Sequence, residues 1–141
     1  MKKLTIMYLS NGGNVEVLAS HIAKGAKDAG AQVLLKVVSE ASVEDVTNAD
    51  VVAFGSPSMD NNQIDQKEML PFINKFKLIP VNNKSTGLFG SYGWDNGEFM
   101  DKWVSLMNEY EFNVVQKLTV NEAPTNEQLT EAEEMGRNLV K

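Results

Sequence analysis

The chain alternates short apolar runs with longer stretches in which apolar residues recur every three or four positions. The short runs predict five strands, at residues 4–9, 32–38, 50–55, 85–90 and 114–120. The longer stretches predict helices at residues 15–29, 65–76, 98–110 and 126–140, with a short helical turn at residues 42–48. Pro71 argues against an unbroken helix over residues 65–76, because proline shifts the start of a helix or kinks it.

Strands that alternate with helices predict an α/β fold, a doubly wound parallel sheet with helices on both faces. No linker or repeat interrupts the pattern, so residues 1–141 are expected to form a single domain. Such sheets bind their ligands outside the carboxyl ends of the strands. The loops that leave three of these strand ends, at residues 10–15, 56–62 and 91–97, therefore form the candidate site.

Composition narrows the chemistry that this site can perform. The chain has no cysteine, which excludes disulfides, thiol catalysis and thiolate metal sites. No run of about 18 apolar residues suggests a membrane span, and residues 4–9 are too short for a signal-peptide core, so we expect a cytoplasmic protein. The net charge of −6 disfavours nucleic acid, whose phosphates need clustered Lys and Arg. This charge serves either solubility alone or steering toward basic protein surfaces.

The first of the three loops has the composition of an anion-binding turn. Its residues are Ser10, Asn11, Gly12, Gly13, Asn14 and Val15, and the predicted helix follows at once. Adjacent glycines let the backbone curl so that several N–H groups point inward, and a helix N-terminus adds a positive partial charge. The lysine of the triphosphate loop GxxxxGK[ST] is missing. The alternative is an ordinary strand-to-helix turn, since sharp turns also need glycine.

The other two loops hold large apolar side chains among turn residues. Trp94 lies between Gly93 and Gly97, a setting that favours an exposed indole stacking on a flat ring over an indole folded back on the sheet. Met59 stands among serine, aspartate and asparagine, and its thioether is a favourable neighbour for an aromatic ring. A phosphate turn, a methionine and a tryptophan together indicate a flat ring that carries a phosphate tail.

These motifs resemble those of the flavodoxin family, in its short-chain, clostridial-like branch. The third flavin loop of the family is similar to Leu-Phe-Gly-Ser-Tyr-Gly-Trp at residues 88–94 with Gly97, and its second to Gly-Ser-Pro-Ser-Met-Asp at residues 55–60. The resemblance covers nearly the whole chain and implies the strand order 2-1-3-4-5 and one non-covalently bound FMN. It also implies a monomeric carrier of single electrons at low potential, rather than a catalyst, that meets redox partners with basic docking surfaces.

The resemblance assigns residues to the cofactor. Trp94 would stack on one face of the isoalloxazine ring and Met59 on the other. Backbone groups would hold the polar edge of the ring, those of Ser56, Ser58, Ser91 and Gly93. The expected FMN-binding residues are Ser10, Asn11, Gly12, Gly13, Asn14, Val15, Ser56, Pro57, Ser58, Met59, Asp60, Asn61, Ser91, Tyr92, Gly93, Trp94 and Gly97. Glu122, just after the last strand, is expected near the ring.

The chain departs from the family pattern at the phosphate. Gly12 and Val15 stand where the family has threonines, so two hydroxyl hydrogen bonds to the phosphate are missing. A flavodoxin-like interaction module with weak or lost FMN binding is therefore the alternative function. A phospho-receiver domain shares the strand order, but it needs acidic residues where this chain has Ser-Asn at residues 10–11 and Phe-Gly at residues 54–55. An FMN-dependent enzyme would need a substrate pocket or an acid–base pair, and the sequence indicates neither beyond the three loops.

One turn of the second loop carries a further expectation from the resemblance. In the family, a backbone carbonyl of this loop turns toward the flavin on reduction, and the matching carbonyl here is that of Asp60. The turn needs a positive φ at Asn61, and asparagine tolerates it. Outside the loops, His21 is expected on a helix surface and Trp103 in the core.

Overall fold

Five strands form one parallel sheet in a computed structural model that describes residues 1–9, 12–94 and 96–141. The strand order is β2-β1-β3-β4-β5, which confirms the predicted fold class. The strands are β1 (Lys3–Tyr8), β2 (Gln32–Val37), β3 (Val51–Gly55), β4 (Ser85–Tyr92) and β5 (Asn113–Asn121). Because β1 pairs with both β2 and β3, the direction of winding reverses at β1. A ligand crevice is expected at the carboxyl ends of the strands around this switch point.

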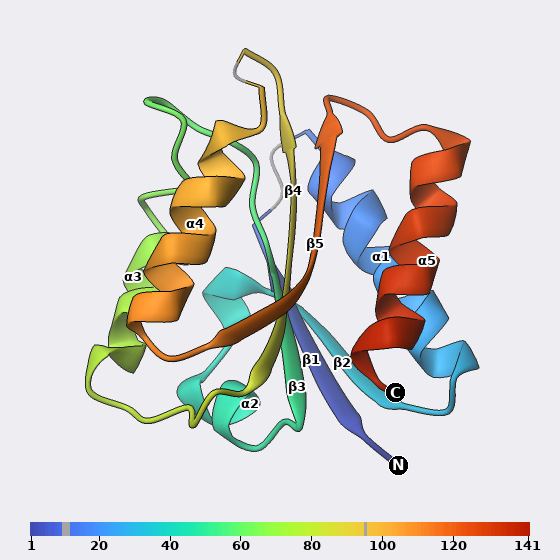
Figure 1. The fold of residues 1–141 in the computed structure, drawn as a ribbon, viewed down its shortest axis with the longest axis vertical. Helices are drawn as coiled ribbons and strands as arrows, with labels where there is room; N and C mark the ends of the chain where they lie inside the picture. The colour runs from blue at the N-terminus through green and yellow to red at the C-terminus, as the bar shows by residue number, and fades with distance from the viewer. Residues whose placement is uncertain (10–11, 95) are drawn as a thin grey trace.

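Helices cover both faces of the sheet, which Figure 1 shows nearly edge-on. One face carries α1 (Asn14–Asp28) and α5 (Asn126–Leu139). The other carries α2 (Val43–Thr47), α3 (Met69–Asn74) and α4 (Glu98–Glu109), and two short 3-10 helices, η1 (Val38–Glu40) and η2 (Lys75–Lys77), complete the described elements. Each face has its own buried apolar cluster, and every residue of β3 is buried because the helices exclude water from both sides.

Two glycines let α1 and α5 approach each other backbone to backbone. A Cβ atom at Gly25 would overlap the backbone of Glu133, and one at Gly136 would overlap the backbone of Ile22. The hydrogen bond between His21 Nδ1 and Glu133 Oε2, 2.8 Å long, joins the same two helices, so His21 lies on a partly buried helix surface. The close packing of α1 against α5 fixes the direction of α1, whose N-terminus belongs to the candidate site.

The predicted helix over residues 65–76 is shorter in the structure, and Pro71 accounts for the difference. The helix α3 begins at Met69, so Pro71 is its third residue, where a backbone N–H has no partner within the helix. The carboxylate of Asp65 accepts hydrogen bonds from the N–H groups of Glu68 and Met69, at 2.7 and 2.9 Å. Residues 65–68 therefore form a capped turn that leads from the candidate site into α3.

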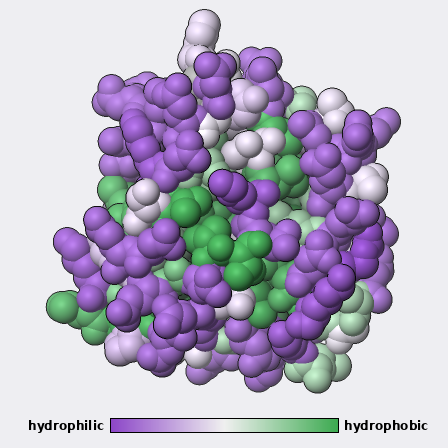
Figure 2. Space-filling model, in the orientation of Figure 1, coloured by the Kyte–Doolittle hydropathy of each residue, from purple (hydrophilic) through white to green (hydrophobic). Residues whose placement is uncertain are grey.

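The strand β5 forms one edge of the sheet and is longer than predicted. A register shift opposite Thr86 and Gly87 leaves Val115 unpaired and 47% exposed. Figure 2 shows hydrophilic residues over most of this side of the molecule, with hydrophobic residues gathered near its centre, where β5 crosses the view. A bulge and an exposed Lys117 on the same strand protect such an edge from pairing with another chain.

None of the described helices is long and apolar enough to cross a membrane.

Candidate functional site

The loops that follow β1, β3 and β4 gather at one end of the sheet, at the top of the view in Figure 1. This is the arrangement expected from the sequence, because parallel strands end on the same side. Ser10, Asn11 and Asp95 lie outside the described residues. The site is therefore built from Gly12 onward in the first loop, from the whole second loop, and from the third loop apart from one residue.

The first loop turns into α1 through two left-handed glycines. Gly12 and Gly13 have φ angles of 94° and 92°, which side chains rarely allow. Gly13 is the N-cap of α1, and no side chain forms a capping hydrogen bond there. The first N–H groups of a helix have no partner within the helix, and the dipole of this 15-residue helix favours an anion at its N-terminus. Val15 is only 1% exposed, so its side chain faces the core.

Hydrogen bonds hold the start of the second loop in place. Ser56 is fully buried, and its hydroxyl donates to the Pro57 carbonyl at 2.8 Å and accepts from the Asp65 N–H at 3.0 Å. The N–H of Ser58 donates to the Ser91 carbonyl at 2.8 Å, which ties the second loop to the third. The side chain of Ser56 is therefore engaged in holding the loop, and its backbone N–H is engaged as well, because it donates to the Phe89 carbonyl at 3.1 Å.

A tight turn projects from the second loop. The N–H of Met59 donates to the Gln63 carbonyl at 2.7 Å and closes the turn at its base. Asn61 and Asn62 both have left-handed backbones, with φ angles of 62° and 54°. Asn61 thus has the positive φ that the expected turn requires, and Asn62 shares this conformation, which the sequence did not indicate.

The third loop leaves Trp94 in solvent. Its side chain is fully exposed, whereas Trp103, nine residues on, is 1% exposed in the core, as predicted. Gly97 has a φ of 83° and is the N-cap of α4. The N–H of Glu122 donates to the Tyr92 carbonyl at 2.7 Å, and a Cβ atom at Gly93 would lie 4.0 Å from Oε1 of Glu122. The structure thus places Glu122 beside the third loop.

A hollow of about 380 Å³ separates the second and third loops. Its lining residues are Ser58, Met59, Asp60, Asn61, Asn62, Gly93 and Trp94. Sites for organic ligands occupy roughly 300–1,000 Å³ and combine apolar walls with a few polar groups. A thioether and an exposed indole on the two sides of one hollow suit a flat aromatic ring, whose burial would remove the indole from water. The residues present fit an isoalloxazine ring. Neither Tyr92 nor the described residues of the first loop line this hollow.

An acidic hollow of about 260 Å³ lies at the end of β1, and the sequence analysis did not identify it. Its lining includes Tyr8, Glu16 and Glu68. The Tyr8 hydroxyl donates to Oε1 of Glu16 at 3.4 Å. Burial, followed by the nearby Glu16 carboxylate, raises the pKa of Tyr8, so this hydroxyl remains a donor at neutral pH.

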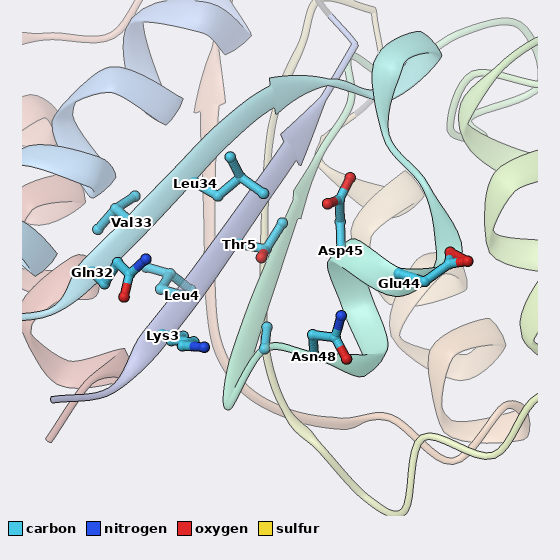
Figure 3. A pocket seen from close by; sticks show the side chains of 10 residues that line it. Lys3, Leu4, Thr5, Gln32, Val33, Leu34, Glu44, Asp45 and Asn48 are labelled. Atoms are coloured by element: carbon cyan, nitrogen blue, oxygen red, sulfur yellow. The ribbon is translucent and has the colours of Figure 1, made fainter.

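A further hollow, of about 210 Å³, lies between α2 and the amino-terminal halves of β1 and β2 (Figure 3). Thr5 and Leu34 face it from the sheet and Asp45 from α2. Oδ2 of Asp45 is 2.9 Å from Nζ of Lys36, so this carboxylate is already paired. The hollow is distant from the carboxyl ends of the strands, and among the predicted site residues that the structure describes, none lines it.

Two residues of α4 reach the turn of the second loop and were missed by the sequence analysis. Nζ of Lys102 donates to the Asn61 carbonyl at 3.0 Å, and Nδ2 of Asn62 donates to Oε2 of Glu98 at 3.3 Å. The only signal in the sequence was their spacing of four residues at the start of a predicted helix, which places both on one helix face. That spacing does not indicate what the face contacts.

Comparison with known proteins places this arrangement in a family. The family model described as flavodoxin matches residues 6–136. A flavodoxin of Megasphaera elsdenii is 36% identical over 96% of this chain and 97% of its own length, and one of Clostridium beijerinckii is 30% identical over 96% and 98%. The solution structure of two-electron reduced Megasphaera elsdenii flavodoxin superposes with a TM-score of 0.86 at 33% identity, covering 97% of this chain and 98% of that one.

The chain belongs to the flavodoxin family. It is an electron-transfer protein that binds FMN, rather than a catalyst, and it works with redox partners. The alternative of an interaction module receives no support from these comparisons.

Proposed function

We propose that the chain carries single electrons at low potential between redox enzymes, on one FMN held by the three loops. Bound FMN supplies the one-electron chemistry, and the protein positions it and controls its surroundings. The residues proposed to hold it are Gly12, Gly13, Asn14, Val15, Ser56, Pro57, Ser58, Met59, Asp60, Asn61, Ser91, Tyr92, Gly93, Trp94 and Gly97, together with Ser10 and Asn11 from the sequence pattern.

The hollow between Met59 and Trp94 is the observation that carries the proposal. An indole with its whole surface in water gains free energy when a flat ring covers it. The hollow lies between two loops that are joined by the Ser58–Ser91 hydrogen bond, so its walls are held together before a ligand arrives. Glu122 lies beside Gly93 in the third loop, and its negative charge is proposed to lie close to the ring.

The phosphate is proposed to lie at the N-terminus of α1. The supporting observations are the left-handed Gly12 and Gly13 and an N-cap without a side-chain partner. Since Val15 faces the core, backbone N–H groups replace the hydroxyl that a threonine would offer. Each hydrogen bond to a charged group contributes about 1.5–3 kcal/mol, so FMN binding is weaker than in a loop with both threonines.

The partners are proposed to present basic docking surfaces to a monomer of this chain in the cytoplasm, with residues 1–141 acting as one domain. The net charge of −6 supports basic partners, because opposite charges raise the rate of encounter. The bulged and charged edge at β5 supports a monomer, because it discourages pairing of one sheet with another.

Titration of FMN with the protein tests the proposed site. Flavin fluorescence is expected to be quenched on binding, and Trp94→Ala is expected to weaken binding of both FMN and riboflavin by roughly 1–3 kcal/mol, the size of a large stacking contact. Leu78→Ala is the matched control, because Leu78 is 93% exposed and lies in the loop before β4, away from the hollow. Equal binding by the Trp94→Ala variant and the wild type would show that the ring binds elsewhere.

A further inference from the structure

The turn that lines the flavin hollow has a costly backbone conformation. Asn61 and Asn62 are consecutive left-handed residues, with φ angles of 62° and 54°. The left-handed conformation costs an ordinary L-residue roughly 1–2 kcal/mol, and asparagine reduces this cost without removing it. The hydrogen bond from Met59 to Gln63 closes the base of the turn but does not contact either asparagine. Other groups are needed to keep the two asparagines in place.

The helix α4 supplies contacts to both asparagines. Nζ of Lys102 donates to the Asn61 carbonyl at 3.0 Å, and Oε2 of Glu98 accepts from Nδ2 of Asn62 at 3.3 Å. The two residues are four positions apart and lie on the same helix face. The cation meets a carbonyl oxygen and the carboxylate meets an amide N–H, so each charge faces the partner that it prefers.

We propose that Glu98 and Lys102, here called the α4 clamp, are positioning residues that hold Asn61 and Asn62 in their left-handed conformation before the flavin binds. The proposal deepens the proposed function, because it rests on this turn forming one wall of the flavin site. Met59, Asp60, Asn61 and Asn62 all line the 380 Å³ hollow, so a change in the turn alters the surface that the ring meets. Preorganised walls raise affinity because binding no longer has to order them.

The clamp is rigid because α4 is anchored in the core. Gly97, the N-cap of α4, ends the third loop, and Phe99 and Trp103 on the same helix are buried in the core. The clamp thus joins the second loop to the helix that begins at the end of the third. The two walls of the hollow are linked on one side by the Ser58–Ser91 hydrogen bond and on the other by α4.

NMR of the full chain, with and without FMN, tests the clamp directly. A positive φ gives a strong intraresidue cross-peak between the amide and α protons, and this signal at Asn61 and Asn62 reports the turn. In the flavin-free Lys102→Met variant we expect the signal to weaken, and in the FMN complex we expect it to recover. Lys102→Arg, which keeps a donor, is expected to resemble the wild type. Lys77→Met removes an exposed lysine in η2, outside the turn and α4, and is the matched control.

Riboflavin affinity measures what the clamp contributes to the ring site. Riboflavin is neutral, so losing the charge of Lys102 does not act through the phosphate. The bond from Lys102 is exposed, so its loss is expected to count as an ordinary net hydrogen bond and to raise the dissociation constant roughly three- to tenfold in Lys102→Met, with no change in Lys77→Met. Glu98→Ala is expected to act in the same direction, and Glu98→Gln, which keeps an acceptor for Asn62, is expected to restore affinity.

A glycine background separates positioning from direct contact with the ring. Glycine adopts positive φ at no steric cost, so the turn needs less support when Asn61 and Asn62 are both replaced. In Asn61→Gly/Asn62→Gly, adding Lys102→Met is expected to change riboflavin affinity less than it does in the wild type. An equal loss in both backgrounds would show that Lys102 acts on the ring itself and would overturn the proposal.

The two measurements distinguish the clamp from the site on which it rests. An unchanged signal from Asn61 in flavin-free Lys102→Met would overturn the clamp, whatever the affinity. A weakened signal with unchanged riboflavin affinity would instead show that the turn is not a wall of the flavin site, and the proposed site would fail while the contact of Lys102 with the turn stood.

Discussion

In the first turns of α1, Val15 and Val17 are chemically identical but have different surroundings. Val15 is 1% exposed and packs in the cluster between the sheet and the helices α1 and α5, whereas Val17 is 41% exposed. Val15 also follows the N-terminus at which the phosphate is proposed to lie. One side chain therefore lies between the core and the ligand, and a change there affects both.

Val15→Thr is expected to lower the free energy of unfolding of the flavin-free protein and to raise its affinity for FMN. A buried hydroxyl without a partner costs about 1–3 kcal/mol, and the phosphate supplies that partner, worth about 1.5–3 kcal/mol. Denaturant unfolding and titration with FMN and riboflavin measure the two effects. Riboflavin, which has no phosphate, should bind unchanged, and Val17→Thr should change neither quantity. Equal tightening of both flavins would place the phosphate elsewhere.

Asp60 places a carboxylate in the lining of the flavin hollow. Fully reduced flavin carries a negative charge, and two like charges near a protein surface repel by about 1 kcal/mol or more. Asp60→Asn is therefore expected to raise the potential at which bound FMN takes up its second electron, with the turn retained. Potentiometric titration measures the change, and Glu109→Gln, at the far end of α4, is the control. An unchanged potential would mean that solvent screens this carboxylate.

At the scale of elements, the contact between α1 and α5 depends on two glycines that leave no space for a Cβ atom. Gly136→Ala would place a methyl group against the backbone of Ile22, which cannot move away as a side chain can. We expect the free energy of unfolding to fall by about 1–3 kcal/mol or more, the cost of overpacking a core. Chemical denaturation measures the change in the free energy of unfolding. The comparison variant is Ala132→Gly, one turn earlier on α5, which removes a methyl group from the helix and so loses packing without creating an overlap. If Gly136→Ala left the free energy of unfolding unchanged, the two helices would be able to move apart without loss of stability.

The pair formed by His21 and Glu133 makes the same helix contact dependent on pH. The hydrogen bond with His21 is the largest cause that lowers the pKa of Glu133, and Lys24 acts in the same direction. A carboxylate whose pKa is lowered by folding stabilises the fold above its ordinary value of 4.5, and the stabilisation is lost as pH falls through the folded value. Glu133→Gln should therefore flatten the fall in stability on acidification below about pH 5. Unfolding measured over this pH range would reject the idea if wild type and variant lost stability in parallel.

The periodicity of the sequence predicted these elements because each helix buries one face and each inner strand is buried on both. It could not predict that the helix over residues 65–76 starts at Met69, since that depends on the Asp65 carboxylate capping the turn before it. The loops of the site were predicted from their composition and family resemblance. The contact of Lys102 with Asn61 could not be predicted, because the sequence does not show which loop an exposed helix face contacts.

At the scale of the whole molecule, negative charge is found beside all three loops. Glu16 and Glu68 line the hollow at the end of β1. Asp60 lines the hollow between the second and third loops, and Glu122 borders the third loop. The lysine closest to the turn of the second loop, Lys102, has its ammonium group engaged with the Asn61 carbonyl. The end of the molecule at which the flavin is proposed to bind thus carries carboxylates, in keeping with the net charge of −6.

Electron transfer to a small basic redox protein should therefore slow as salt is added. Screening shortens the range of charge interactions from about 10 Å at 0.1 M to about 3 Å at 1 M, so encounters lose their steering. Stopped-flow rates over this range of salt should fall, and Glu122→Gln should lower both the rate at low salt and its dependence on salt. Glu109→Gln removes the same charge at the opposite end of α4, beside the loop that precedes β4, and should change the rate much less. Equal effects of the two variants would mean that partners respond to the total charge rather than to the flavin end. Rates that do not fall with salt would mean that the acidic surface serves solubility alone.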